Sequence, residues 1–231
     1  MFFELIGSSY ESFEVLYMVG LLVVSAFIAI WLHAVGHRIM QAICMGRDFD
    51  NSIKESFNPL KVFSLKNIFS IAVMFVFSFT KLDEVKAPCV SRFKNILIAL
   101  SGVFANFFWA FVAMIGYDAL VIMEWNEMLP EYGTFIQSFL MAFVSANLSI
   151  ALFNILPLPS LDGGVLLAQF MPEKAGETFL SWRRYSLFII TVAIVFFSRS
   201  GIADFLIGSV AELFDSIILA IAQKYFNVNL Y

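Results

Sequence analysis

The chain alternates long apolar runs with short polar segments. Three runs carry no charged residue: 18 residues over 15–32, 23 residues over 95–117 and 30 residues over 132–161. About 20 apolar residues in a helix cross the hydrocarbon core of a bilayer. The first two runs therefore predict membrane-spanning helices. The third is long enough to cross and then to continue as an irregular segment through Pro157 and Pro159.

Other apolar segments are shorter or interrupted by charges. Residues 67–80 form an uncharged run of 14 between Lys66 and Lys81, which predicts a re-entrant or interfacial segment, or a β-hairpin-like one because Val and Phe recur in it. Residues 185–198 predict a short or tilted span. In the last segment three acidic residues form one polar stripe, namely Asp204, Glu212 and Asp215. The stripe fits either an interfacial helix or a span whose stripe faces protein.

The composition supports a membrane protein. Hydrophobic residues make up 61% of the chain and charged residues 14%, far from the balance of a soluble domain. We therefore expect an all-α integral membrane protein, a polytopic helical bundle of about four to six membrane segments, forming a single membrane-embedded domain over 1–231. No basic stripe interleaved with aromatics indicates nucleic-acid binding. Two cysteines support neither a disulfide framework nor a thiolate zinc site.

The distribution of charges predicts the orientation. The segment after the first run is basic, so the positive-inside rule places it in the cytoplasm and the N-terminus outside; its basic residues are Arg47, Lys54, Lys61 and Lys66. Residues 118–131 are acidic without Lys or Arg, which fits the outside. The N-terminus lacks the basic region of a cleavable signal peptide, and we expect it to be retained.

The only two histidines, His33 and His37, lie at the far end of the first run. Positions four apart share one face of a helix, so both imidazoles can bind one metal ion. Histidine in a membrane span is costly and usually faces protein or a wet cavity. The alternative is that the pair forms hydrogen bonds between helices.

A catalytic zinc site needs a third protein ligand and an open position. Asp162 is the best candidate, because its predicted depth matches that of the histidines. Two prolines before it and two glycines after it predict a bent backbone that can bring the carboxylate towards a neighbouring helix. The alternative is an aspartate that caps a turn, since Asp-Gly is a common turn pair.

Asn106 lies in the middle of the second long run, four residues after Gly102. An amide in hydrocarbon needs a partner. It either forms an interhelical hydrogen bond or binds the backbone or the developing oxyanion of a substrate. Cys44 cannot share the histidine site, because it lies eleven residues, or about 16 Å, along the helix from His33.

Taken together, these residues resemble the site-2 protease family of intramembrane zinc metalloproteases, in particular its small bacterial and archaeal members. The resemblance covers roughly 32–166, including Phe57-Asn58-Pro59-Leu60-Lys61 and Lys86-Ala87-Pro88. It implies one zinc ion per chain held by His33, His37 and Asp162. It also implies that Asn106 and Asn154 lie near the scissile peptide and that 67–80 lies near the substrate entrance.

Ala34 departs from the family, which has glutamate directly after the first histidine. That carboxylate takes a proton from water and later delivers it to the leaving amine. Alanine cannot do this, and the nearest carboxylates along the chain are distant, namely Asp48, Asp50 and Glu14. We expect a chain that binds zinc but hydrolyses peptides very slowly. Ala34 is either an engineered substitution, the interpretation that we favour, or the mark of a natural pseudoprotease.

The resemblance further implies a place and partners for the protein. It predicts a multi-pass protein of the cell (inner or cytoplasmic) membrane with its active site near the cytoplasmic side. Expected partners are the lipid bilayer and a transmembrane protein substrate, such as an anti-sigma factor or a signal-peptide remnant. The competing class is non-enzymatic: an adaptor that binds membrane segments without cleaving them, or a transporter with a histidine-lined path.

Overall fold

The computed structural model describes residues 12–45, 91–128, 130–185, 188–189, 192, 196 and 200–226, and it contains no β-strand within them. This confirms the predicted all-α fold. Within these residues four helices are long and apolar enough to cross a membrane. The predictions for 67–80, for the motifs at 57–61 and 86–88, for the N-terminal end and for most of 185–198 lie outside the described residues.

The three long apolar runs form the three helices around which the described chain is built. They are α2 (Ser12–Met45), α6 (Arg92–Ile122) and α8 (Pro130–Asn154). Ser91 caps the start of α6 by accepting a hydrogen bond from Lys94 N, and α8 begins at a proline, which lacks the backbone donor that a first turn leaves unused. The chain leaves α8 shortly before Pro157, and an irregular segment follows, as predicted.

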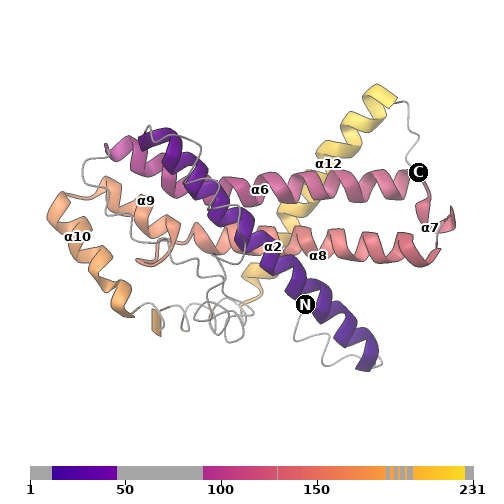
Figure 1. Ribbon diagram of the computed structural model, residues 1–231, viewed down its shortest axis with the longest axis horizontal. Helices are drawn as coiled ribbons and strands as arrows, with labels where there is room; N and C mark the ends of the chain where they lie inside the picture. The colour runs from indigo at the N-terminus through magenta and orange to yellow at the C-terminus, as the bar shows by residue number, and fades with distance from the viewer. Residues whose placement is uncertain are drawn as a thin grey trace.

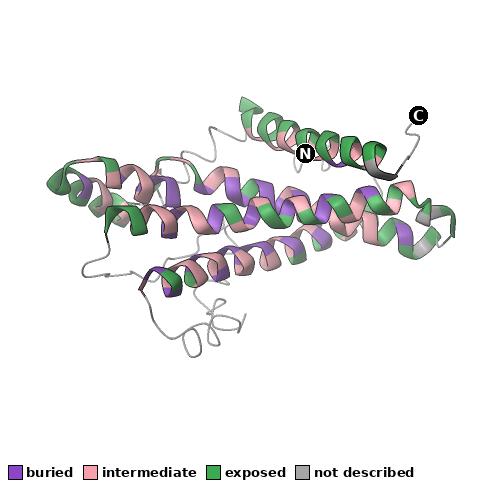
Figure 2. Cartoon of the chain, turned by 90° about the horizontal axis from the view of Figure 1, so that it is seen from above, coloured by how far each residue is buried: buried purple, intermediate pink, exposed green. Residues whose placement is uncertain are grey.

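Helices α6 and α8 run side by side in opposite directions, joined by the short α7 (Trp125–Met128). Helix α2 crosses this pair obliquely (Figure 1), and α12 (Ile202–Phe226) packs on its other face (Figure 2). The largest buried cluster joins α6, α8 and α12. Its members are Ala110, Ala113, Met114, Phe143, Val144, Leu148 and Ile218.

One sequence expectation changes at the end of α6. Asp118 was assigned to a loop outside the membrane, but α6 continues to Ile122 and buries Asp118 to 3% exposure. Its carboxyl group interacts with that of Asp215 on α12. At that point the polar stripe of the last segment therefore faces protein.

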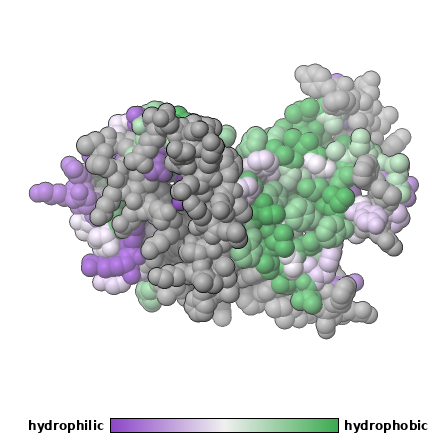
Figure 3. All heavy atoms as spheres, in the orientation of Figure 1, coloured by the Kyte–Doolittle hydropathy of each residue, from purple (hydrophilic) through white to green (hydrophobic). Residues whose placement is uncertain are grey.

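Short helices follow α8 at one end of the bundle. They are α9 (Asp162–Phe170), α10 (Glu173–Ser181) and a 3₁₀ turn over Trp182–Tyr185. Hydrophilic side chains gather over this end, whereas hydrophobic side chains cover much of the long-helix region on the face shown in Figure 3. This surface pattern fits long helices in a bilayer with α9 and α10 towards one of its sides.

Candidate metal centre

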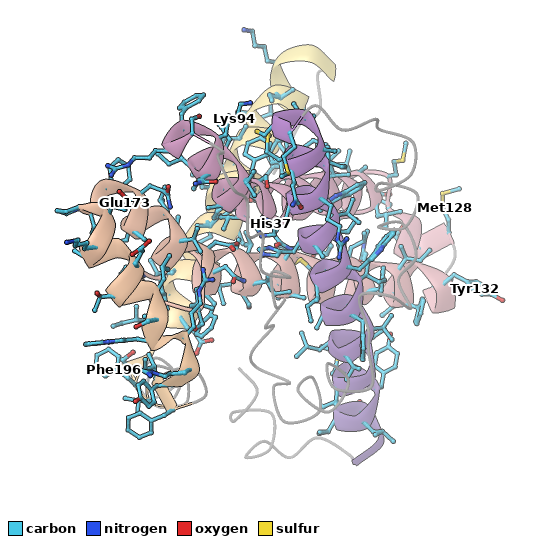
Figure 4. All side chains as sticks on the ribbon, turned by 60° about the vertical axis from the view of Figure 1, so that its left-hand side comes forward. His37, Lys94, Met128, Tyr132, Glu173 and Phe196 are labelled. Atoms are coloured by element: carbon cyan, nitrogen blue, oxygen red, sulfur yellow. The ribbon has the colours of Figure 1, made fainter. Side chains whose placement is uncertain are left out.

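The structure brings His33, His37 and Asp162 together. Both histidines lie on one face of α2, and Asp162 is the first residue of α9. The Nε2 atoms of the two histidines are 3.0 Å apart. Asp162 Oδ2 lies 3.1 Å from His33 Nε2 and 3.2 Å from His37 Nε2. Figure 4 shows His37 on the side of α2 that faces the other helices. Within the described residues these three form a group that could hold a metal ion.

The spacing and burial of this triad fit zinc. Zinc ligands sit about 2.0–2.1 Å from the ion in a tetrahedron, which places neighbouring ligand atoms about 3.3 Å apart. The observed separations of 3.0–3.2 Å are close to that value. His33, His37 and Asp162 are 0%, 5% and 3% exposed, so the site is enclosed by protein. Two imidazoles and one carboxylate match the three protein ligands of a catalytic zinc site, which keeps its fourth position for water or substrate.

The other ring nitrogens hold both imidazoles in one tautomer. His37 Nδ1 lies 2.7 Å from the backbone oxygen of Ile98. A carbonyl oxygen only accepts, so this nitrogen carries a proton and donates. His33 Nδ1 donates to Asn106 Oδ1 over 2.6 Å. Both Nε2 atoms are therefore free to direct a lone pair at a shared ion, which is the usual arrangement of histidine ligands and their partners.

This arrangement calls for a positive charge at its centre. Two Nε2 lone pairs and a carboxylate oxygen face one another within 3.2 Å, and like partial charges at that distance repel in a buried site. A proton or a metal cation between them turns the repulsion into attraction. Burial alone raises the pKa of Asp162, but where the Nε2 atoms carry a proton their hydrogen bonds to the carboxylate outweigh it and lower that pKa to about 2.

A close helix crossing leaves room beside the triad. A Cβ on Gly102 of α6 would lie 2.7 Å from His33 Nε2 and closer still to His37 Nε2. Nearby, a Cβ on Gly36 of α2 would come within 2.8 Å of both Ala105 Cβ and Ser101 O. Glycines at these two positions let α2 and α6 approach closely and keep the space next to the imidazoles free of side chain.

The segment that carries Asp162 is folded tightly against the end of α8. Any side chain at Gly163 or Gly164 would collide with backbone oxygens of residues 155, 156 or 158. Arg183 Nε donates to Pro159 O over 2.8 Å and so ties this segment to the 3₁₀ turn. The predicted bend through the two prolines and two glycines is thus what carries Asp162 back to α2.

Both asparagines named from the sequence are buried, but only Asn106 contacts the triad. Asn106 Nδ2 donates to Ala29 O over 3.1 Å and to Asn147 Oδ1 over 2.8 Å, while its oxygen accepts from His33. The interhelical hydrogen bonds that were one alternative are therefore present. Asn154 Nδ2 donates to Ile150 O of its own helix. The expected contacts of both residues with a substrate stay predictions.

Sequence reasoning missed Asn147. It lies within the third long apolar run, is 0% exposed and links α8 to Asn106 of α6. An asparagine in an otherwise apolar span is a signal that could have identified it, since such a group needs a partner in hydrocarbon.

Ala34 is half-buried beside His33, where the family has its glutamate. The buried acidic residues in this part of the chain are Asp162, a member of the triad, and Asp118. Asp118 lies sixteen residues after Gly102 on α6, which is about 24 Å along the helix.

Comparisons with known proteins support a metalloprotease. The model of peptidase family M50 matches residues 118–198, which include Asn154 and Asp162. A Bacillus subtilis (strain 168) protein named "Putative zinc metalloprotease YwhC" is 30% identical over 106 residues. No solved structure matches the chain. The two matches support the resemblance to the site-2 protease family.

The match to the relative is partial. It covers 45% of this chain and 47% of the Bacillus protein, so the chain spans about half of that relative's length. The described residues thus show an all-α fold with four helices long and apolar enough to cross a membrane, and they place His33, His37 and Asp162 together.

Proposed function

We propose that this chain is a site-2-protease-type membrane protein that binds one zinc ion through His33, His37 and Asp162. We further propose that its counterpart with glutamate at position 34 cleaves peptide bonds within or near transmembrane segments. The convergence of three buried ligand atoms within 3.2 Å, among helices long enough to span a membrane, carries the proposal. The M50 match and the name of the Bacillus relative support it.

Each residue of the centre has a distinct task. His33 and His37 present Nε2 lone pairs, and their Nδ1 protons are held by Asn106 and by the Ile98 carbonyl. Asp162 supplies a negative charge that offsets a dication in a buried site. When bound there, zinc would polarise a peptide carbonyl and make water a better nucleophile at neutral pH. Gly102 leaves space beside the ligands.

The missing group is the proton carrier at position 34. General acid–base catalysis contributes about 10²- to 10⁴-fold to a rate, and the family's glutamate would act in both roles. The chain with Ala34 should therefore bind zinc and hydrolyse peptides very slowly. If Ala34 is natural, the same geometry serves an adaptor that binds membrane segments without cutting them, and this is the second candidate function.

A buried site also constrains the substrate. A helical segment hides its carbonyl groups in its own hydrogen bonds, so it must partly unwind before a peptide bond can reach the triad. We propose transmembrane proteins as substrates, such as an anti-sigma factor or a signal-peptide remnant, with cleavage near the cytoplasmic face of the cell membrane. Residues that weaken the helix at the cleavage point should speed cleavage.

Metal analysis tests the site. Protein purified without chelator should carry about one zinc ion per chain. The zinc should be lost on His33→Ala or Asp162→Ala, whereas Cys44→Ala, outside the triad, should retain it. Well-folded protein without zinc, which also fails to bind added zinc, would refute the proposed centre.

Restoring the proton carrier tests the reaction. Ala34→Glu should cleave single-span membrane substrates at least about 100-fold faster than the chain with Ala34. The gain should vanish in the double variant with His37→Ala. A zinc-loaded Ala34→Glu protein that leaves a broad panel of such substrates intact would favour the adaptor.

A further inference from the structure

A chain of buried amide groups runs from α8 through α6 to the metal centre on α2. It begins at Asn147, passes through Asn106 and ends at Nδ1 of His33, with hydrogen bonds of 2.8 and 2.6 Å. All three residues are 0% exposed. This series of hydrogen-bonded side chains therefore connects three helices through a region where water cannot replace a lost hydrogen-bond partner.

Backbone carbonyls fix the direction of this chain. Asn147 Nδ2 faces the oxygen of Phe143 at 2.9 Å, and one N–H of Asn106 faces the oxygen of Ala29 at 3.1 Å. Carbonyl oxygens only accept, so neither amide can turn over without placing two acceptors against each other. Asn147 must present its oxygen to Asn106, and Asn106 must present its own oxygen to His33.

The direction of the amides sets the tautomer of the ligand. An oxygen facing Nδ1 keeps the proton of neutral His33 on Nδ1 and leaves Nε2 with a lone pair for the metal. If Asn106 turned over, its NH₂ group would face Nδ1 and favour the proton on Nε2, which cannot then bind a metal. Asn147 Oδ1 opposes that turn because it accepts from the NH₂ group of Asn106.

We propose that Asn147 is a positioning residue of the metal centre: through Asn106 it holds His33 in the tautomer that binds metal. The expected effect on zinc affinity rests on the proposed zinc site, whereas the expected effect on the His33 tautomer does not. Asn147 does not touch the triad itself. His37 depends on a different acceptor, the backbone oxygen of Ile98, so it should keep its Nδ1 proton when Asn147 is changed.

The tautomer can be read directly in metal-free protein. The chain has only two histidines, so ring-¹⁵N-labelled histidine gives four nitrogen signals, assigned through a His37→Gln variant. In the unsubstituted chain both rings should carry a proton on Nδ1 near neutral pH, whether or not a further proton bridges the Nε2 atoms and Asp162. In Asn147→Leu, where Ala29 O alone still opposes the turn of Asn106, the His33 ring should shift in part towards the Nε2–H form, while His37 keeps its proton on Nδ1. Asn147→Asp, which retains an oxygen acceptor for Asn106, should keep the original pattern.

Metal affinity provides the second measurement. Loss of partners of metal ligands typically weakens binding about 10- to 100-fold, and we expect about 10-fold for Asn147→Leu. The control is Leu148→Ala, which disturbs the next buried side chain of α8 without touching the amide chain. It should lower thermal stability and leave zinc affinity within about two-fold.

The outcomes separate the two proposals. An unchanged His33 tautomer in folded Asn147→Leu overturns the positioning role, whether or not zinc binds. An equal loss of affinity in Leu148→Ala also overturns it, because the effect would then follow packing. If the leucine variant does not fold, Asn147→Ala is measured with the same expected shift and the same refuting result. A shifted tautomer in a chain that never binds zinc supports the amide chain and refutes only the zinc centre.

Discussion

Gly102 is the residue whose missing side chain matters most to the metal centre. Its Cα faces both Nε2 atoms, and a methyl group there would overlap the space beside them. Gly102→Ala should therefore weaken zinc binding by at least about 10-fold, even though alanine favours a helix by about 1 kcal/mol over glycine. Competition with a chelator of known affinity measures the change.

A second glycine of the same helix supplies the control. A Cβ on Gly116 would lie 3.6 Å from Leu140 Cδ1, an ordinary contact, so Gly116→Ala should leave zinc affinity unchanged. Equal affinities for the two variants would show that the space beside the imidazoles is not needed by the metal.

Acid should release the metal through the imidazoles and not through Asp162. The lowered pKa of Asp162, about 2, keeps this carboxylate ionised well below neutral pH. Its interactions therefore stabilise the folded chain above pH 3.8, its ordinary pKa, and are lost as the pH falls towards 2. As the pH falls through about 6.5, the ordinary pKa of histidine, and below it, zinc binding should weaken with a slope approaching two protons per ion. A slope of three in that range would mean that Asp162 also takes up a proton.

At the scale of elements, the segment between α8 and α9 decides where Asp162 lies. Backbone hydrogen bonds join its two ends to α8 and α9, and Arg183 donates to its Pro159 O over 2.8 Å. Hydrogen bonds from charged donors contribute about 1.5–3 kcal/mol. Arg183→Gln should therefore loosen the segment and weaken zinc binding several-fold while the long helices stay folded.

The neighbouring arginine is a matched control for this prediction. Arg184 is exposed and stacks over the ring of Tyr185, 5.1 Å from its centroid. Arg184→Gln removes the same charge without touching the segment at Pro159. Zinc titrations of the two variants should differ, and an equal loss of affinity would assign the effect to net charge.

The sequence predicted the long helices and the histidine pair because both depend on strong, local signals. Uncharged runs define α2, α6 and α8, and histidines four apart define one helical face. The end of α6 was misassigned because Asp118 resembles a loop residue until its partner on α12 is known. Asn147 was missed because its importance depends on the crossing of α6 and α8, a contact that no local pattern encodes.

At the scale of the whole molecule, the antiparallel pair α6 and α8 places the metal centre at a definite depth. Gly102 lies ten residues after the first residue of α6, about 15 Å along the helix. The triad is thus well inside the bundle and not at its end. Asp162 reaches this depth because the chain turns back after α8, which makes the short helices α9 and α10 a cap over one end of the site.

This arrangement predicts that α7 and α10 lie on opposite sides of the membrane. Helix α8 has 25 residues, or about 37 Å, enough to cross a hydrocarbon core of about 30 Å. In a background with Cys44→Ala and Cys89→Ala, single variants Glu127→Cys and Lys174→Cys test the topology, since both side chains are exposed. An impermeant thiol reagent should label Lys174→Cys from the cytoplasmic side alone and Glu127→Cys from the outside alone. Labelling of both positions from one side would contradict a crossing by α8, and the opposite assignment would place the metal centre near the outer face of the membrane.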